Sequence, residues 1–181
     1  MMLRLLLAIL CFSSFGVKTN NDDVIQWKSS YRLNWNDFKA APPPNAANAA
    51  LTSSGILIKF TSNGESLTYE ISCNFVKTSS WGRVKNDHIL SHEQGHFDIA
   101  EIYARKLNKE LKEYCYNDRS VGKDVNTIYK TVMGELLDMQ NLYDQQTDYS
   151  RNFGQQKEWL VKIDNYLDDL KAYAGYRYTM N

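Results

Sequence analysis

The chain has 181 residues, with 21 basic and 21 acidic side chains and a formal net charge of zero. No block of lysine and arginine stands out, which argues against a nucleic-acid partner and against an anionic membrane surface. The part of the chain after position 16 is long enough for one domain with a proper core.

The amino terminus predicts a secretory signal peptide. Arg4 supplies a short basic region, residues 5–12 form an apolar run, and the small residues Ser14 and Gly16 precede a possible cleavage point. The run is too short to span a bilayer stably. We therefore expect residues 1–16 to be removed and the mature protein to be secreted or periplasmic, without stable membrane insertion.

Export decides how the three cysteines are interpreted. Cys11 lies in the leader, and the leucine before it is larger than the small residue that a lipobox needs, so we expect no lipid anchor. Cys73 and Cys115 then remain as an even pair in an oxidising compartment. We predict a disulfide between them, and the alternative is two small buried apolar residues.

The first part of the mature chain, residues 20–81, is predicted to be rich in β-structure. Residues 55–61 and 67–75 alternate apolar and polar side chains with a period of two, which predicts two strands. Asn63-Gly64 between them is a turn signal, so the pair is predicted to form an antiparallel hairpin. The prolines at 42–44 and the alanines and asparagines after them predict an extended surface connection.

After this region the period changes to threes and fours, which predicts helices. The first helix should run from about residue 88 to 114 with Asp87 as its cap, and Asp124 can cap the second. The third should run from about 153 to 173. The predicted fold class is α+β, in which an N-terminal antiparallel β-sheet precedes one long helix and two further C-terminal helices, the helical part covering residues 87–175.

The first helix contains His92-Glu93-Gln94-Gly95-His96. Two histidines four positions apart point their imidazoles to one face, about one turn apart, which suits two ligands of a tetrahedral zinc. Glu93 can then reach a metal-bound water as a general base without binding the metal. This HExxH spacing is typical of metal-dependent hydrolases. The alternative is an amphipathic helix whose histidines are merely half-buried and hydrogen-bonded.

Two neighbours of the motif need separate interpretation. The Cα of His88 should lie roughly 12 Å from that of His96 along a straight helix, so we expect His88 to start the helix or to support the ligands. Gly95 costs about 1 kcal/mol relative to alanine inside a helix. Its missing side chain predicts either close approach of a strand or substrate, or tight packing of a neighbouring helix.

A catalytic zinc normally has three protein ligands, and the motif supplies only two. No histidine follows His96, so the third ligand must be a carboxylate or a tyrosine. The candidates in the turn between the second and third helices are Asp144, Asp148 and Tyr149, with Glu135 and Asp138 farther back. Asp98 or Glu101 could orient a ligand imidazole through its free nitrogen, and a surface salt bridge is the alternative for both.

The segment LSHEQGHFDIAEIYARKL resembles a bacterial domain family of unknown function whose members are described as candidate secreted zinc-dependent proteases. Ser80-Trp81, YDQQT, QKEWLVKID, WNDFKAAPP and AALTSSGI share the resemblance, and HEQGHFD is its most specific part. It implies one zincin-like domain over residues 17–181, in which His92 and His96 bind Zn²⁺ and Glu93 is the general base. The family pattern has a histidine and a small residue where this chain has Tyr149-Ser150, which bears on catalysis more than on the fold.

These observations favour a secreted zinc-dependent hydrolase, a metallopeptidase that acts on a peptide or protein substrate. A sheet edge could accept an extended peptide as an added strand. A catalytically impaired zincin-like domain, acting as an exported binding or structural module, is the alternative. A plain exported scaffold without metal would require the motif to be accidental.

Overall fold

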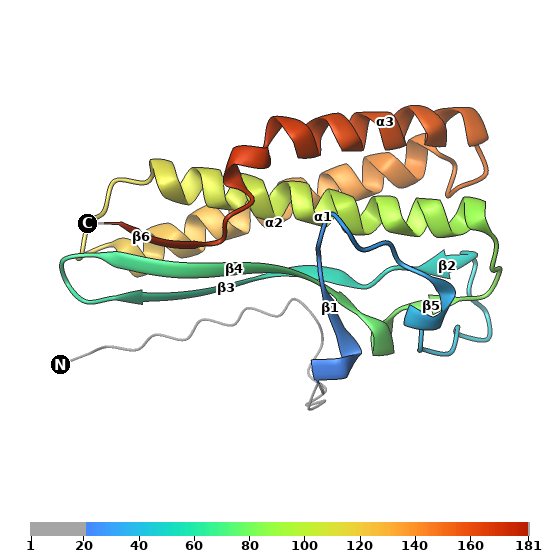
Figure 1. Cartoon of the computed structure of the whole chain (residues 1–181), viewed down its shortest axis with the longest axis horizontal. Coiled ribbons are helices and arrows are strands. Elements are labelled where there is room, and N and C mark those ends of the chain that lie inside the picture. Colours follow the sequence, from blue (N-terminus) through green and yellow to red (C-terminus); the bar gives the residue numbers. More distant parts are fainter. Residues whose placement is uncertain (1–20, 181) are drawn as a thin grey trace.

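The computed structural model describes residues 21–180, so the signal peptide predicted for residues 1–16 lies outside the described residues. Figure 1 shows a layer of antiparallel strands with the long helices packed on one side of it. The elements, in chain order, are η1 (Asn21–Asp23), β1 (Val24–Gln26), η2 (Trp35–Asp37), β2 (Ala50–Leu51), β3 (Ser54–Ser62), β4 (Leu67–Val76), η3 (Lys77–Ser79), β5 (Trp81–Gly82), α1 (Asp87–Glu113), α2 (Val121–Gln146), α3 (Phe153–Asp169), η4 (Lys171–Tyr173) and β6 (Arg177–Met180). Across these residues, no helix combines the length and the apolar character needed to cross a bilayer.

The predicted hairpin is confirmed by β3 and β4, which pair antiparallel with Ile58 opposite Ile71. Gly64 takes a φ of 90° in the turn between them, a backbone conformation that suits glycine. In the part of the chain that the structure describes, β1 and β6 also pair antiparallel with β4 and complete a four-stranded sheet. The predicted α+β order, sheet first and helices after it, is therefore correct.

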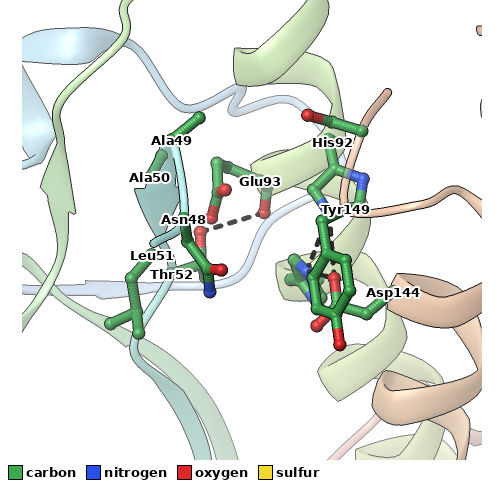
Figure 2. A pocket seen from close by; sticks show the side chains of 11 residues that line it. Asn48, Ala49, Ala50, Leu51, Thr52, His92, Glu93, Asp144 and Tyr149 are labelled. Carbon is green, nitrogen blue, oxygen red and sulfur yellow. Dashed lines mark hydrogen bonds and ion pairs between the residues drawn. The ribbon is translucent and has the colours of Figure 1, made fainter. Parts of the chain in front are cut away.

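A second, smaller sheet joins β2 to β5, with Ala50 opposite Gly82 and Leu51 opposite Trp81. This sheet was not predicted, because strands of two residues are too short to show a period. Its importance is its position, since β2 contacts α1 and the segment around β2 faces the His92–His96 motif (Figure 2).

Helix α1 lies between the sheet and the other two long helices of the described chain, contacting β3 and β4 as well as α2 and α3 (Figure 1). Its residues Ile99, Ala104, Leu107 and Leu111 are completely buried. Burial of each leucine or isoleucine contributes roughly 1.5–3 kcal/mol. Because α1 is covered on several sides, its polar residues are also buried and must find partners within the protein.

The helix caps differ from two of the predictions. Asn86 caps α1, accepting a hydrogen bond from the backbone N–H of Ile89 at 2.9 Å, whereas the predicted cap Asp87 is already the first helical residue. Helix α2 begins at Val121, three residues before Asp124, so the Asp124 prediction is also wrong. The carboxylate of Asp124 instead accepts hydrogen bonds from the hydroxyls of Ser120 and Tyr114.

The predicted disulfide is absent, because Cys73 and Cys115 are both free thiols. Cys73 belongs to the face of β4 that is buried in the core, and it is fully buried. Cys115 follows the end of α1 and is exposed to solvent. Cys73 therefore corresponds to the alternative interpretation, a small buried apolar residue.

Candidate metal centre

Helix α1 and the last turns of α2 bring His92, His96 and Asp144 together. Oδ1 of Asp144 is 3.1 Å from Nε2 of His92 and 3.1 Å from Nε2 of His96, and the two Nε2 atoms are 3.1 Å apart. Ligand atoms about 2.0–2.2 Å from a tetrahedral zinc stand roughly 3.3–3.6 Å from one another. The three side chains thus have nearly the spacing that one metal ion requires.

The other predicted candidates for a third ligand have different surroundings. Asp148 is exposed and pairs with Arg151, whose nitrogens lie 2.7 and 3.0 Å from its carboxylate. Glu135 pairs with Lys106 on the flank of the helices. Tyr149 lines the same cavity as the two histidines and Asp144.

Gln140 fixes the orientation of His96, a role that the sequence did not predict. Nδ1 of His96 is hydrogen-bonded to Oε1 of Gln140, and the amide nitrogen of Gln140 donates to the backbone carbonyl of His96 at 2.9 Å. A proton on Nδ1 leaves Nε2 with a free lone pair that points toward Asp144. The available signal was spacing, because Gln140 lies four residues before Asp144 and therefore on the same face of α2.

Asp98 and Glu101, which were predicted to orient a ligand imidazole, contact neither histidine. Asp98 accepts hydrogen bonds from Nε1 of Trp27 at 2.7 Å and from the amide of Gln94 at 2.8 Å. Glu101 is hydrogen-bonded to Arg105 and to the hydroxyl of Tyr176. The reason is helical geometry, since positions two and five residues after His96 project well away from its face of the helix.

His92 is held by the aromatic ring of Tyr143. The two rings stack with centroids 4.5 Å apart and planes 17° apart, and the hydroxyl of Tyr143 donates to the backbone carbonyl of His92 at 3.3 Å. The same tyrosine explains Gly95, because a Cβ at this position would lie 2.5 Å from its hydroxyl oxygen. Of the two explanations predicted for Gly95, the close packing of a neighbouring helix is the one found.

His88 takes no part in the group of possible ligands. It is the second residue of α1, its Nε2 is hydrogen-bonded to the backbone carbonyl of Ser150 at 2.6 Å, and its ring stacks on Phe153. These contacts attach α1 to the turn after Asp144, and they are consistent with the expectation that His88 starts the helix or supports the ligands.

The charges at this centre depend on one another. Burial alone would raise the pKa of Asp144, but hydrogen bonds to His92 and His96 outweigh it and hold that pKa well below its usual value. Burial lowers the pKa of His92. For His96, burial is outweighed by Asp144, Glu93 and Gln140, and the pKa is raised. Two imidazole nitrogens and one carboxylate oxygen face one point, and a metal ion that binds there must displace the protons that they carry.

Glu93 lies beside this group and is only 4% exposed. Burial raises the pKa of its carboxyl, while hydrogen bonds from Thr52 and the charge of His96 lower it in part. Among the described residues, Oε2 of Glu93 has no hydrogen-bond partner. A buried carboxylate oxygen without a partner is costly, so this oxygen requires a functional explanation.

The centre opens into a cavity of about 120 Å³. Figure 2 shows Asn48 to Thr52 on one side of it and His92, Tyr149 and Asp144 on the other, with Glu93 between them. A cavity needs about 10–15 Å³ of volume measured in this way to hold one water molecule, so this one can admit several waters or a small part of a substrate. A metal held here would be reachable from outside.

A family described as a bacterial protein of unknown function (DUF922) matches residues 15–154. The chain belongs to this family. The match spans strands β1 to β5, α1 with its histidines, α2 and the turn that carries Tyr149, and it stops at the start of α3, before β6. No curated protein and no solved structure matches the chain.

Proposed function

We propose that this member of the family is a zinc-dependent hydrolase, and specifically a peptidase, with His92, His96 and Asp144 as the metal ligands. The supporting observation is the convergence of these three side chains on one point that lies in an open cavity beside the buried carboxylate of Glu93. Its exported location, expected from the predicted signal peptide, is part of the same proposal.

The set of donors favours zinc. Two imidazole nitrogens and one carboxylate oxygen match the ligands of catalytic zinc sites, which keep a further position open for water or substrate. The hydrogen bond from His96 to Gln140 resembles the outer contacts that orient metal-binding histidines elsewhere. When bound, Zn²⁺ would polarise a carbonyl group and lower the pKa of a water molecule toward neutrality.

Glu93 is suited to move the proton in such a reaction. The carboxylate of Glu93 faces the cavity, and its Oε2 atom has no hydrogen-bond partner among the described residues. Burial raises the pKa of this carboxyl, which favours a role as general base. We propose that Oε2 takes a proton from the attacking water and returns it to the departing amine. A site used only for structure would have no need of this carboxylate.

A non-catalytic metal-binding module is the second candidate. Tyr149-Ser150, at the position where the related pattern has a histidine, favours it. The presence of Asp144 beside the two histidines weakens this argument, because a third donor is available without that histidine.

Zinc content and peptide cleavage, measured on the same preparations, separate the two candidates. We expect about one zinc per chain in the parent protein, loss of zinc in His92→Ala, and retained zinc without cleavage in Glu93→Gln. Lys106→Ala is the control, because Lys106 lies on the same helix and pairs with Glu135 outside the proposed ligand set, so this variant should keep its zinc.

Cleavage would be followed with a broad library of quenched fluorescent peptides. Parent protein that holds zinc and cleaves none of them would favour the binding module. Parent protein that takes up no zinc would contradict both candidates.

A further inference from the structure

The turn between α2 and α3 has an unusual backbone. Asp148, Tyr149 and Ser150 have φ values of 48°, 52° and 70°, and they are the positive-φ residues other than glycine within the described chain. The left-handed region is unfavourable for L-residues because Cβ approaches the following carbonyl oxygen. Three such residues in succession therefore need strong support from their surroundings.

Contacts on several sides supply this support. The backbone N–H of Tyr149 donates to the carbonyl of Asp144 at 2.8 Å, and the N–H of Asn152 donates to the carbonyl of Thr147 at 2.8 Å. The carbonyl of Ser150 is held by His88, and the pairing of Arg151 with Asp148 closes the turn. Strained residues that are fixed in this way are concentrated at functional sites.

This turn places the side chain of Tyr149 at the cavity. Tyr149 lines the cavity together with His92, Glu93 and Asp144, and Figure 2 shows its ring on the side of the cavity opposite Asn48 and Thr52. Its side chain is 46% exposed, so core packing does not explain its placement. The ring lies beneath the guanidinium of Arg151, 5.8 Å from the centroid, and its hydroxyl makes no hydrogen bond to another described residue.

Hydrolysis needs a hydrogen-bond donor in this cavity, in addition to the proposed metal ligands and the proposed base. Attack on a carbonyl places negative charge on its oxygen, and a fixed hydrogen-bond donor stabilises this charge. Glu93 and Asp144 supply only acceptors in their ionised forms. Asn48, Thr52, Ser150 and Tyr149 are the cavity residues with neutral side-chain donors, and the hydroxyl of Thr52 already donates to the backbone carbonyl of Glu93 at 3.2 Å. The phenol of Tyr149 is a neutral donor, and its backbone is hydrogen-bonded to Asp144, so its position is tied to a proposed ligand.

We infer that Tyr149 is a catalytic residue whose hydroxyl donates a hydrogen bond to the oxygen of the carbonyl group under attack. The inference rests on the proposed function. It also gives the tyrosine a role distinct from that of a metal ligand, which Asp144 already provides.

Binding of acetohydroxamate tests this role without requiring a known substrate. The probe binds zinc through a carbonyl oxygen and an adjacent oxygen, so it places an oxygen where the polarised carbonyl would lie. We expect zinc-loaded Tyr149→Phe to bind zinc as the parent does and to bind acetohydroxamate about tenfold more weakly, the effect of removing one hydrogen bond to a charged oxygen. Tyr173→Phe, the same change at a tyrosine that does not line the cavity, should leave both affinities unchanged.

Zinc affinity is measured first, by competition with a chelator, and probe affinity second, by calorimetry on the loaded protein. Equal probe affinity in Tyr149→Phe and the parent would overturn the inference alone. Loss of zinc from Tyr149→Phe would also overturn it, by making the phenol a metal ligand. A parent protein without zinc affinity would overturn the proposed function and this inference together, before any probe is added.

Discussion

Asp144 and Asp148 are the same residue type four positions apart, and they have opposite environments. Asp144 is still on α2, on the face that carries Gln140, whereas Asp148 lies beyond the helix end at Gln146 and points to solvent with Arg151. We predict that Asp144→Asn weakens zinc binding by at least about a hundredfold, because a direct ligand should matter more than the outer contacts worth roughly 10–100-fold.

Asp148→Asn is the matched control and should retain the affinity of the parent, as measured by competition with a chelator. If Asp148→Asn were the variant that loses zinc, the assignment of the third ligand would be wrong.

Zinc binding should also depend on pH through His96. Its pKa is raised, so the metal-free protein keeps this proton to a higher pH than a free histidine would, whereas burial lowers the pKa of His92. Zinc must displace the proton of His96. Affinity should therefore rise with pH, by up to about tenfold per unit, as long as His96 is protonated, and this rise should continue above the ordinary histidine value of about 6.5 and level off once His96 is neutral.

Isothermal titration in buffers of different ionisation enthalpy would count the protons released. We expect more than half a proton per zinc near pH 6.5, because a raised pKa leaves His96 mostly protonated there. Release of no proton there would show that His96 is already neutral and would contradict the charge arrangement described above.

The residues of the centre were only partly predictable. His92, Glu93 and His96 follow from spacing along one helix, which is local information. The choice among Asp144, Asp148 and Tyr149 depended on where α2 ends, and sequence patterns do not fix helix ends to the residue. Gln140 was missed because glutamine is not a typical partner of a metal site, although its spacing from Asp144 was visible.

At the scale of elements, the packing of α1 against α2 depends on Gly95. Tyr143 is fully buried, stacked on His92 and packed against Trp159, so it has little room to move away from an added Cβ. We predict that Gly95→Ala lowers the free energy of unfolding by roughly 1–3 kcal/mol, as overpacking does. It should also weaken zinc binding by shifting His92.

Gly134→Ala is the control, since a Cβ there meets no other atom within 4 Å. Gly134 lies within α2, and the change should raise the free energy of unfolding by about 1 kcal/mol through helix propensity. Urea denaturation of the metal-free proteins measures both. A stabilised Gly95→Ala would contradict the packing that we describe.

The elements with a clear period were predicted, and the ones without it were not. Strands β3 and β4 and the long helices have enough residues to show their periodicity. The pair β2 and β5 is held by its contacts with α1 and not by local preference. The N-cap of α1 was predicted one residue too late, because Asn86 and Asp87 are both good capping residues and only the structure distinguishes them.

At the scale of the whole molecule, the order of sheet and helices was predicted from the sequence, but the return of the C-terminal segment to the sheet as strand β6 was not. Strand β6 pairs with β4, more than a hundred residues earlier, with Arg177 opposite Glu70. The turn before β6 is held by Asn108 of α1, which is fully buried and donates hydrogen bonds to the carbonyls of Tyr173 and Gly175 at 2.6 and 2.7 Å. Such pairing over long sequence distances leaves no local pattern.

The same architecture places the proposed ligands on two helices, α1 and α2, so a bound ion would join them. The most direct test is a crystal structure of the zinc-loaded protein with anomalous data collected at the zinc edge. We predict one strong peak within about 2.0–2.2 Å of Nε2 of His92, Nε2 of His96 and a carboxylate oxygen of Asp144. A zinc peak bound elsewhere, or none in protein shown to contain one zinc per chain, would contradict the account.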